Sequence, residues 1–460
     1  MRKTLVLLIV GLNRRLIGPQ TPNLQALMQR GALRTLGTVV PAVTCTVQST
    51  LLTGLPPSGH GAVANGWYFR DHAEVLLWRQ SNRLIAGEKV WDAAKRRDPN
   101  FTCANMFWWY NMYSTVDISA TPRPMYPADG RKIPDHYAEP PQLKAELDAK
   151  FGPFPLFTFW GPMTSIESSR WIARATQHVR RTRAPTLTLC YLPHLDYGLQ
   201  KYGPDSQHPS IASDLREVDA LAGELIDEAE RAGDRILVVS EYGIVPVREA
   251  VHINRELRKA GLMRIKTEMG RELLDAGASK AFALADHQVA HVYLQHGANA
   301  SEVAKLLRSV DGVAQVLDED GKRAIGLDHS RSGDLVVLSN PDRWFSYYYW
   351  LDDARAPDFA ATVDIHRKPG YDPMELFLDP ALKAPKLRVA RRLAARKLGF
   401  RNLMDVIPIT GTSLVKGSHG LITADENDAP VVISNDAGLL PKGAIPAVAF
   451  KDLMLAHVFT

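Results

Sequence analysis

The chain has 460 residues, of which 45% are hydrophobic and 23% are charged, and its formal net charge is +5. This composition is typical of a globular protein. The small net charge suits an anionic small molecule as ligand and gives little support for nucleic-acid binding. Three widely spaced cysteines form neither a CxxC pair nor a disulfide framework, which favours a reducing, cytoplasmic location. No segment reaches the ~18 apolar residues of a membrane span, and nothing in the composition indicates an oligomeric state.

The N-terminal part of the chain predicts strands and helices in alternation. Residues 4–12 are a continuous apolar run, as in a strand that is covered on both faces. The run resembles a signal peptide, but it stops at Asn13 and no small-residue cleavage site follows it. The next segments predict a helix within 21–31, a strand near 34–40 and a short helix that ends at Gly54.

Two later segments depart from this regular order. Residues 66–170 are rich in Trp, Tyr, Pro and Asn and predict an inserted cap, whose aromatic side chains either pack in a core or stack on a planar substrate group. Residues 340–400 predict a second insertion. Within it, the basic run 387–400 favours a solvated amphipathic helix over a phosphate or membrane patch. Because strands and helices alternate around these segments, residues 1–460 are predicted as a single α/β domain with a largely parallel sheet.

Three predicted strands lead into polar residues at their carboxyl ends. The first strand ends at Asn13, the strand near 185–192 leads to Asp196, and the strand near 235–240 leads to Glu241. Ligands of open α/β sheets bind beyond the carboxyl ends of parallel strands. The three side chains are therefore expected at one edge of the sheet, in a common site.

Thr44 lies just before or at the start of the short helix that ends at Gly54. A helix N-terminus offers free backbone N–H groups and the positive end of the helix dipole, which can hold a phosphate against a hydroxyl group. The local sequence alone favours a simpler role, in which Thr44 or Thr46 only caps the helix.

The segment PAVTCTVQSTLLTGLPPSGHGAVANGW, which contains Thr44, resembles the nucleophile segment of the type I phosphodiesterase/nucleotide pyrophosphatase family of the alkaline phosphatase superfamily. The family pattern places TG, Pro and an HG-x-x-x-N run after its Thr. Four further segments resemble family segments and occur in the family's order: TPNLQALMQRGA, HLDYGLQKYGP, VVSEYG and KGSHG. The resemblance implies a three-layer α/β/α fold with a mostly parallel central sheet, and hydrolysis of phosphodiester or pyrophosphate bonds by a Thr nucleophile assisted by two zinc ions.

Carried over position by position, the resemblance makes Thr44 the nucleophile and Asp196 and His419 metal ligands. Four other ligand positions are changed; three of the changes remove charge or basicity from the metal cage, whereas Glu241 keeps a carboxylate that is one methylene longer. The changed positions are Asn13 in place of an Asp, Gln200 in place of a His, and Glu241 and Tyr242 in place of an Asp-His pair. Neutral carbonyl oxygens are poor zinc ligands. We therefore expect one divalent metal ion, or two that are held by rebuilt ligand sets, instead of an intact two-zinc site.

Other polar residues can compensate for these changes. Arg14 and Arg15 can pair with a substrate phosphate, although a solvated loop is the simpler interpretation. Asn65 belongs to the matched nucleophile segment and is assigned to substrate binding. Alternative metal ligands, each of which is more often a structural residue, are His194, His252, Asp286, His287, His329 and His366.

The sequence thus predicts a metal-dependent phosphoryl hydrolase, a phosphodiesterase or pyrophosphatase that acts on a phosphorylated small molecule. Two alternatives stay open: a diverged protein that binds a phosphorylated ligand without turnover, and a phosphoryl transferase or mutase that uses the same Thr. For all three, we expect Asp196, Glu241 and His419 within ~10 Å of the Thr44 hydroxyl, as a compact phosphoryl-transfer site requires.

Overall fold

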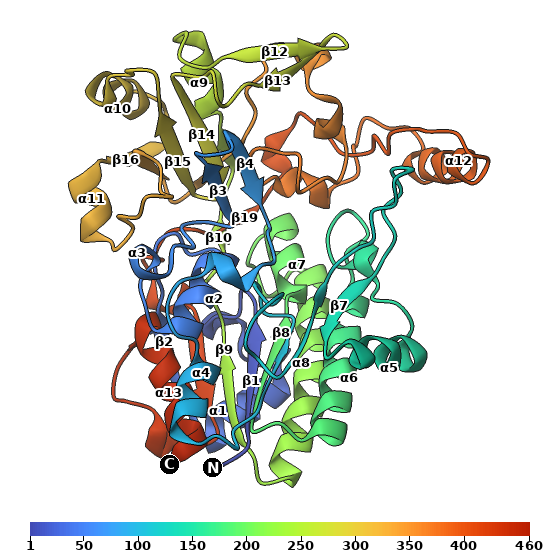
Figure 1. Ribbon diagram of the computed structural model, residues 1–460, viewed down its shortest axis with the longest axis vertical. Coiled ribbons are helices and arrows are strands. Elements are labelled where there is room, and N and C mark those ends of the chain that lie inside the picture. The colour runs from blue at the N-terminus through green and yellow to red at the C-terminus, as the bar shows by residue number, and fades with distance from the viewer.

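The computed structural model describes all residues, 1–460, and its centre is a nine-stranded sheet (Figure 1). The strand order is β21-β2-β20-β9-β1-β8-β5-β6-β7. Strand β1 pairs in parallel with β8 and β9, whereas β7 and β20 run antiparallel to their neighbours. The bounds are β1 (Thr4–Ile9), β2 (Ala32–Gly37), β5 (Cys103–Met106), β6 (Ile118–Pro122), β7 (His136–Glu139), β8 (Leu187–Leu192), β9 (Arg235–Val239), β20 (Val431–Ser434) and β21 (Ile445–Pro446).

Helices cover both faces of this sheet, which gives three layers. One face packs against α1 (Pro22–Arg30), α6 (Ile166–Arg183) and α8 (Pro209–Arg231), and the other against α2 (Thr44–Thr53), α4 (Val90–Arg97) and α13 (Phe450–Phe459). All six residues of β1 are buried, because the sheet is covered on both sides. The apolar run at the N-terminus is therefore a central strand, as predicted, and the three-layer α/β/α fold class is confirmed.

A second lobe with its own core stands on the carboxyl edge of the central sheet (Figure 1). The chain enters this lobe after β10 (Val245–Pro246) and leaves it before β19 (Gly417–Ser418), and these two strands pair with each other. Its antiparallel sheet has the order β14-β15-β17-β16. Its elements include β11 (Glu249–Val251), α9 (Ile253–Lys259), β12 (Ile265–Glu268), β13 (Arg271–Leu274), β14 (Ala281–Asp286), β15 (Val289–Leu294), α10 (Ala300–Arg308), β16 (Val313–Leu317), α11 (Glu319–Ala324), β17 (Leu335–Ser339), β18 (Arg343–Phe345) and α12 (Pro385–Lys397).

The segment predicted as a cap, 66–170, divides between the two parts of the molecule. Its hairpin of β3 (Gly66–Phe69) and β4 (Glu74–Leu77) packs on the core of the second lobe. Its later part supplies three strands, β5, β6 and β7, to the central sheet and continues into α5 (Pro141–Phe151). The segment 340–400 lies inside the second lobe. Half of the Phe, Trp and Tyr side chains in 66–170 are buried.

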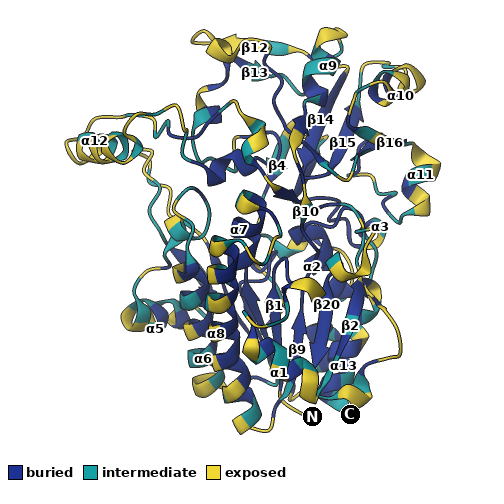
Figure 2. Cartoon of the chain, turned by 180° about the vertical axis from the view of Figure 1, so that it is seen from behind, coloured by how far each residue is buried: buried dark blue, intermediate teal, exposed yellow.

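The three cysteines are buried and unpaired. Among the helices of the structure, none combines the length and the apolar character that crossing a membrane requires. Figure 2 shows that buried residues fill both the central sheet and the second lobe, while α12 is intermediate to exposed along its length.

Candidate active site

Thr44 is the first residue of α2, directly after the extended residue Val43. Its side chain is buried, and its hydroxyl oxygen lies 3.2 Å from the hydroxyl oxygen of Tyr242. The Tyr242 hydroxyl in turn donates a hydrogen bond of 3.3 Å to Oδ1 of Asp196. Since the Tyr242 hydrogen points to the carboxylate, the Thr44 hydroxyl donates to the Tyr242 oxygen. A continuous chain of hydrogen bonds therefore runs from Thr44 to a buried carboxylate.

Asp196 and Gln200 lie one turn apart on α7 (His194–Tyr202). The Gln200 amide nitrogen donates to Oδ2 of Asp196 over 2.8 Å, and its carbonyl oxygen accepts from the Tyr371 hydroxyl over 2.8 Å. Burial raises the pKa of Asp196 to about 7, because loss of hydration outweighs the hydrogen bonds from Tyr242 and Gln200. Both ends of the Gln200 amide are thus engaged by neighbouring residues, where the family pattern has a histidine.

His419 presents a free ring nitrogen to Asp196. Its Nδ1 lies 2.7 Å from the backbone oxygen of Ala42, so Nδ1 carries the hydrogen. Its Nε2 is buried without a hydrogen-bond partner and lies 3.8 Å from Oδ1 of Asp196. Burial holds the pKa of His419 well below its usual value. The imidazole is therefore neutral with an unprotonated Nε2 near the carboxylate, which is the form that binds metal ions.

Four aromatic rings form a continuous stack beside Thr44. The ring centroids of Tyr242 and His419 are 3.6 Å apart, those of His419 and His287 are 3.7 Å apart, and those of His287 and Tyr371 are 3.7 Å apart. Two of the rings come from the second lobe, where His287 occupies the β14–β15 turn. The site is therefore built jointly by the central sheet and the second lobe.

Glu241 follows β9 and is fully buried. Its Oε1 accepts a hydrogen bond of 2.5 Å from the Gln48 amide nitrogen, whereas its Oε2 has no partner. Burial raises the pKa of Glu241 well above its usual value. The Gln48 carbonyl accepts from the backbone N–H of Trp109 over 2.6 Å, so Gln48 connects Glu241 to the loop after β5.

Asn65 connects the start of α2 to the second lobe. Its side-chain oxygen accepts from the Cys45 backbone N–H over 3.0 Å, and its side-chain nitrogen donates to Oδ1 of Asp286 over 3.1 Å. The same Asp286 oxygen lies 2.8 Å from Nδ1 of His287. Burial raises the pKa of Asp286 to about 6, against the opposing effect of the Asn65 hydrogen bonds. Asn65 and Asp286 thus hold the first turn of α2 and the His287 turn together.

The three N-terminal candidates lie in the short helix after β1 or directly before it. The Asn13 side-chain oxygen caps the short helix after β1 by accepting from the Leu16 backbone N–H over 3.1 Å. Arg14 is exposed in that short helix. Arg15 is also exposed and forms ion pairs with Asp425 and Asp428.

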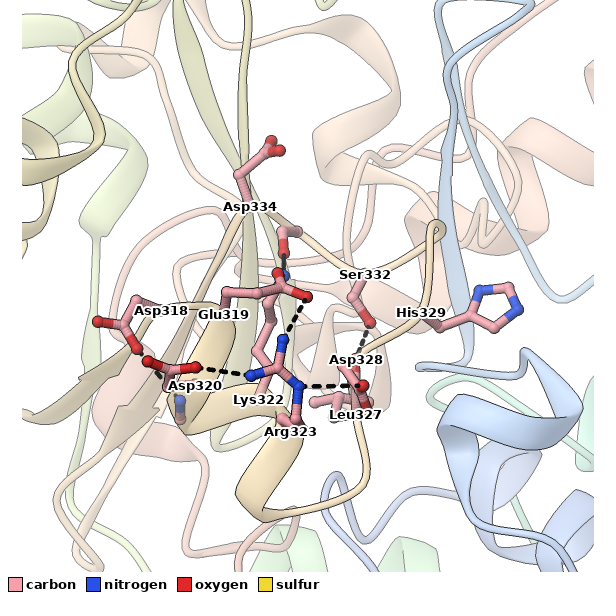
Figure 3. Close-up of polar contacts among 12 residues, drawn as sticks. Asp318, Glu319, Asp320, Lys322, Arg323, Leu327, Asp328, His329, Ser332 and Asp334 are labelled. Carbon is pink, nitrogen blue, oxygen red and sulfur yellow. Dashed lines mark hydrogen bonds and ion pairs between the residues drawn. The ribbon is translucent and has the colours of Figure 1, made fainter.

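Two of the alternative histidines bind partners of their own in the second lobe. His252 lies 2.5 Å from the Ser346 hydroxyl, and burial lowers its pKa to about 4. His329 follows α11 and accepts a hydrogen bond from the Arg331 backbone at its Nδ1. Figure 3 shows His329 pointing away from the ion pairs that Glu319 and Arg323 make on that helix.

Two further histidines lie near other elements. His366 has its Nδ1 3.4 Å from the backbone oxygen of Leu77 at the end of β4. His194 begins α7, two residues before Asp196, and this spacing turns the two side chains to opposite sides of a helix. The His194 Nε2 lies 3.2 Å from Asp214 and 3.7 Å from Glu217, both on α8. The structure therefore directs His194 toward α8.

Two residues of the site were not among the sequence candidates. Gln48 stands four residues after Thr44 on the same helix face, a spacing that could have revealed it. Tyr371 lies in the loop segment DIHRKPGYDP, where only His366 was singled out. A buried ammonium fixes this loop, since Lys368 lies 2.7 Å from both Asp372 and Glu375. No local pattern links Tyr371 to Thr44.

Comparison with known proteins gives a family and a fold. The family model for type I phosphodiesterase / nucleotide pyrophosphatase matches residues 4–372. An uncharacterized pyrophosphatase/phosphodiesterase of Schizosaccharomyces pombe is 26% identical over 240 residues, which cover 50% of this chain but only 42% of that protein.

Two solved structures share the fold. Phosphonoacetate hydrolase from Sinorhizobium meliloti has a TM-score of 0.62 at 16% identity and covers 99% of this chain and 96% of its own. Murine ectonucleotide pyrophosphatase/phosphodiesterase 5 has a TM-score of 0.56 at 15% identity and covers 99% and 95%. Because the family match spans most of the sequence, the chain belongs to the type I phosphodiesterase/nucleotide pyrophosphatase family.

Proposed function

We propose that the protein hydrolyses a phosphodiester or pyrophosphate bond in a phosphorylated small molecule, with Thr44 as the nucleophile. The observation that carries this proposal is the hydrogen-bond chain from Thr44 through Tyr242 to Asp196. Thr44 also occupies the first position of α2. Backbone N–H groups and the dipole at this end of a helix favour an anionic phosphate group.

The hydrogen bonds from Thr44 through Tyr242 to Asp196 supply a path for the proton of the Thr44 hydroxyl. As the Thr44 oxygen attacks phosphorus, its proton moves to the Tyr242 oxygen, and the Tyr242 proton moves to a lone pair of the Asp196 carboxylate that a bound metal ion would leave free. The bond from phosphorus to the leaving oxygen breaks, and that oxygen leaves with the bonding electron pair. Water then cleaves the phosphoryl-Thr44 intermediate and regenerates the hydroxyl. Tyr242 therefore relays a proton at a position where the family pattern has a metal-binding histidine.

We propose one divalent metal ion, bound by Asp196 and His419, with zinc as the first ion to test. Two ligand atoms on one tetrahedral zinc ion stand roughly 3.3–3.5 Å apart, and the 3.8 Å between His419 Nε2 and Asp196 Oδ1 is close to this spacing. When bound, such an ion polarises a phosphoryl oxygen as a Lewis acid. A second ion is less well supported, because Asn13 offers only a neutral carbonyl oxygen that caps the short helix after β1, and such an oxygen is a poor zinc ligand.

The substrate class rests on chemistry shared with similar proteins. Murine ectonucleotide pyrophosphatase/phosphodiesterase 5 has been solved in complex with AMP, and the S. meliloti hydrolase in complex with phosphonoformate and with phosphonoacetate. Two half-buried tryptophans lie beside the ring stack. The ring centroids of Trp78 and Trp160 are 6.3 Å and 5.6 Å, respectively, from that of Tyr371. Aromatic faces of this kind suit a planar substrate group, so a nucleotide is the first substrate to test.

The test is turnover of a nucleoside triphosphate, a nitrophenyl phosphodiester, a nitrophenyl phosphate and phosphonoacetate, each with zinc, manganese, magnesium or a chelator. We expect hydrolysis that Thr44→Ala reduces by at least roughly a thousandfold, since removal of a nucleophile has effects of this size or larger. Thr46→Val is the matched control, because Thr46 is buried on the same helix and its hydroxyl has no partner.

Two other outcomes would replace the proposal. The altered ligand positions and the closely packed ring stack favour, as the second candidate, a protein that binds a phosphorylated ligand without turnover. Tight AMP binding together with no turnover under any metal condition would establish that role. Stable phosphate on Thr44 that is passed to an acceptor other than water would instead identify a transferase.

A further inference from the structure

The helix α12 is a strongly basic element on an arm at the side of the second lobe (Figures 1 and 2). Between Pro385 and Arg401 the sequence contains seven basic residues and no acidic residue. None of the residues of α12 is buried. The function proposed for Thr44 makes no use of this helix, so its charge requires a separate explanation.

One side of α12 is attached to the lobe. Arg388 and Arg392 both form ion pairs with Asp405 in the segment that follows the helix. Val389, on the same side, packs partly buried against the core of the second lobe. These contacts fix the rotation of the helix, so the residues on its other side point steadily to solvent.

The outward side carries an apolar stripe. Leu387, Ala390, Ala394 and Leu398 follow one another at intervals of three, four and four residues, which places them along one face of a helix. All four are exposed, Leu387 by 61% and Leu398 by 76%. Phe400, just beyond the helix, is 66% exposed.

Basic side chains flank this stripe on both sides. At 100° per residue, Arg391 lies beside the stripe on one flank, and Lys386 and Lys397 lie on the other. All three are exposed, and none forms an ion pair. The face therefore has apolar side chains in the middle and cations along both edges. Helices that lie in the interface of an anionic bilayer have this arrangement.

We propose that the outward face of α12 binds the surface of an anionic phospholipid bilayer, with Leu387, Leu398 and Phe400 among the acyl chains and the flanking cations at the phosphates. A second copy of the chain is a poor occupant, because two such helices would bring many positive charges together. Nucleic acid would pair with the cations but would leave the apolar stripe in water. The bilayer is the ligand that matches both parts of the face.

The test is co-sedimentation of the full chain with lipid vesicles. Vesicles of phosphatidylcholine mixed with phosphatidylglycerol should bind the protein, vesicles of phosphatidylcholine alone should not, and high salt should release it. Replacing Arg391 and Lys397 by Gln should weaken binding by about 30-fold, since each basic residue at the surface contributes about fivefold. The matched control replaces two exposed lysines of other regions, Lys305 and Lys442, by Gln and should bind as the parent does.

A second variant separates insertion from simple charge attraction. Leu398→Asn with Phe400→Asn keeps every charge, and it should weaken vesicle binding by at least about tenfold. These side chains are exposed, so unchanged circular dichroism and thermal melting should confirm the fold. No binding to anionic vesicles overturns the proposal, and so does parent-like binding by this apolar variant. A dimer in sedimentation velocity that only the apolar variant disrupts, without vesicle binding, overturns it in favour of self-association.

Discussion

The helix that contains Thr44 is hydrogen-bonded to a histidine, His60, which stays neutral in the folded protein. His60 is completely buried in α3 (Pro57–His60). Its Nδ1 accepts a hydrogen bond from the Ala62 backbone N–H over 3.1 Å, so the hydrogen must sit on Nε2, which lies 2.9 Å from the Thr50 hydroxyl. The Thr50 hydroxyl in turn donates to the Thr46 backbone oxygen on α2. A second proton, on Nδ1, would face the Ala62 N–H directly.

Because protonation of His60 is unfavourable in the folded protein, the free energy of unfolding depends on pH in a defined way. Burial lowers the pKa of His60 from 6.5 to about 3, and neighbouring cations add to the effect. The unfolded chain therefore takes up a proton below pH 6.5, whereas the folded chain does not until about pH 3. The contribution of neutral His60 to the free energy of unfolding is fully present above pH 6.5, and it is lost as the pH falls from 6.5 to about 3. The loss should reach about 2 kcal/mol at about pH 5.

The assay is urea unfolding of the parent, His60→Asn and His72→Asn near neutral pH and at about pH 5. The asparagine side chain in His60→Asn keeps an acceptor for Ala62 without a titratable ring, so this variant should lose about 2 kcal/mol less on acidification than the parent. His72 is exposed, so its substitution should leave the parent's pH dependence unchanged. Other buried histidines act equally in all three proteins. Identical acid sensitivity of the parent and His60→Asn would refute the reasoning.

Three other substitutions test the site and its supports. Tyr242→Phe removes the proton path from Thr44 and should lower kcat roughly 100-fold or more with little change in KM; an unchanged kcat would exclude the path. Lys368→Met leaves two buried carboxylates without their cation and should cost about 3–5 kcal/mol in urea unfolding; a loss below about 1 kcal/mol would contradict this burial effect. Gly243→Ala places a methyl group in steric overlap with the backbone oxygen of Asp428 and should cost ~2 kcal/mol or more, so a melting temperature equal to that of the parent would be inconsistent with the close approach.

The parts of the fold that the sequence predicts well are those with strong local patterns. The unbroken apolar run of β1 can be satisfied only inside a covered sheet, and the glycine at position 54 marks the end of α2. The strands within 66–170 lack such a signal, because β5, β6 and β7 have only four or five residues each among prolines and aromatic residues. Whether such a short segment forms a strand depends on its contacts with neighbouring strands of the sheet, which the local sequence does not specify.

The candidate site shows the same division. Thr44, Asp196 and His419 lie in segments that resemble family motifs, so motif spacing alone is enough to propose their positions. Tyr371 and Gln48 acquire their places through contacts with Gln200, Glu241 and other remote residues. Periodicity reports the neighbours within one helix or strand, and it contains no information about pairs that are separated by 171 or 193 positions.

The paired strands β10 and β19 mark the two ends of the segment that forms most of the second lobe. This segment is about a third of the chain. Both ends of this segment lie side by side, so a change in its length need not separate the strands of the central sheet. Yet that lobe contributes His287 and Tyr371 to the ring stack. The stretch that supplies Thr44 and the stretch that supplies His287 and Tyr371 are therefore separate in the sequence, although their side chains meet in one site.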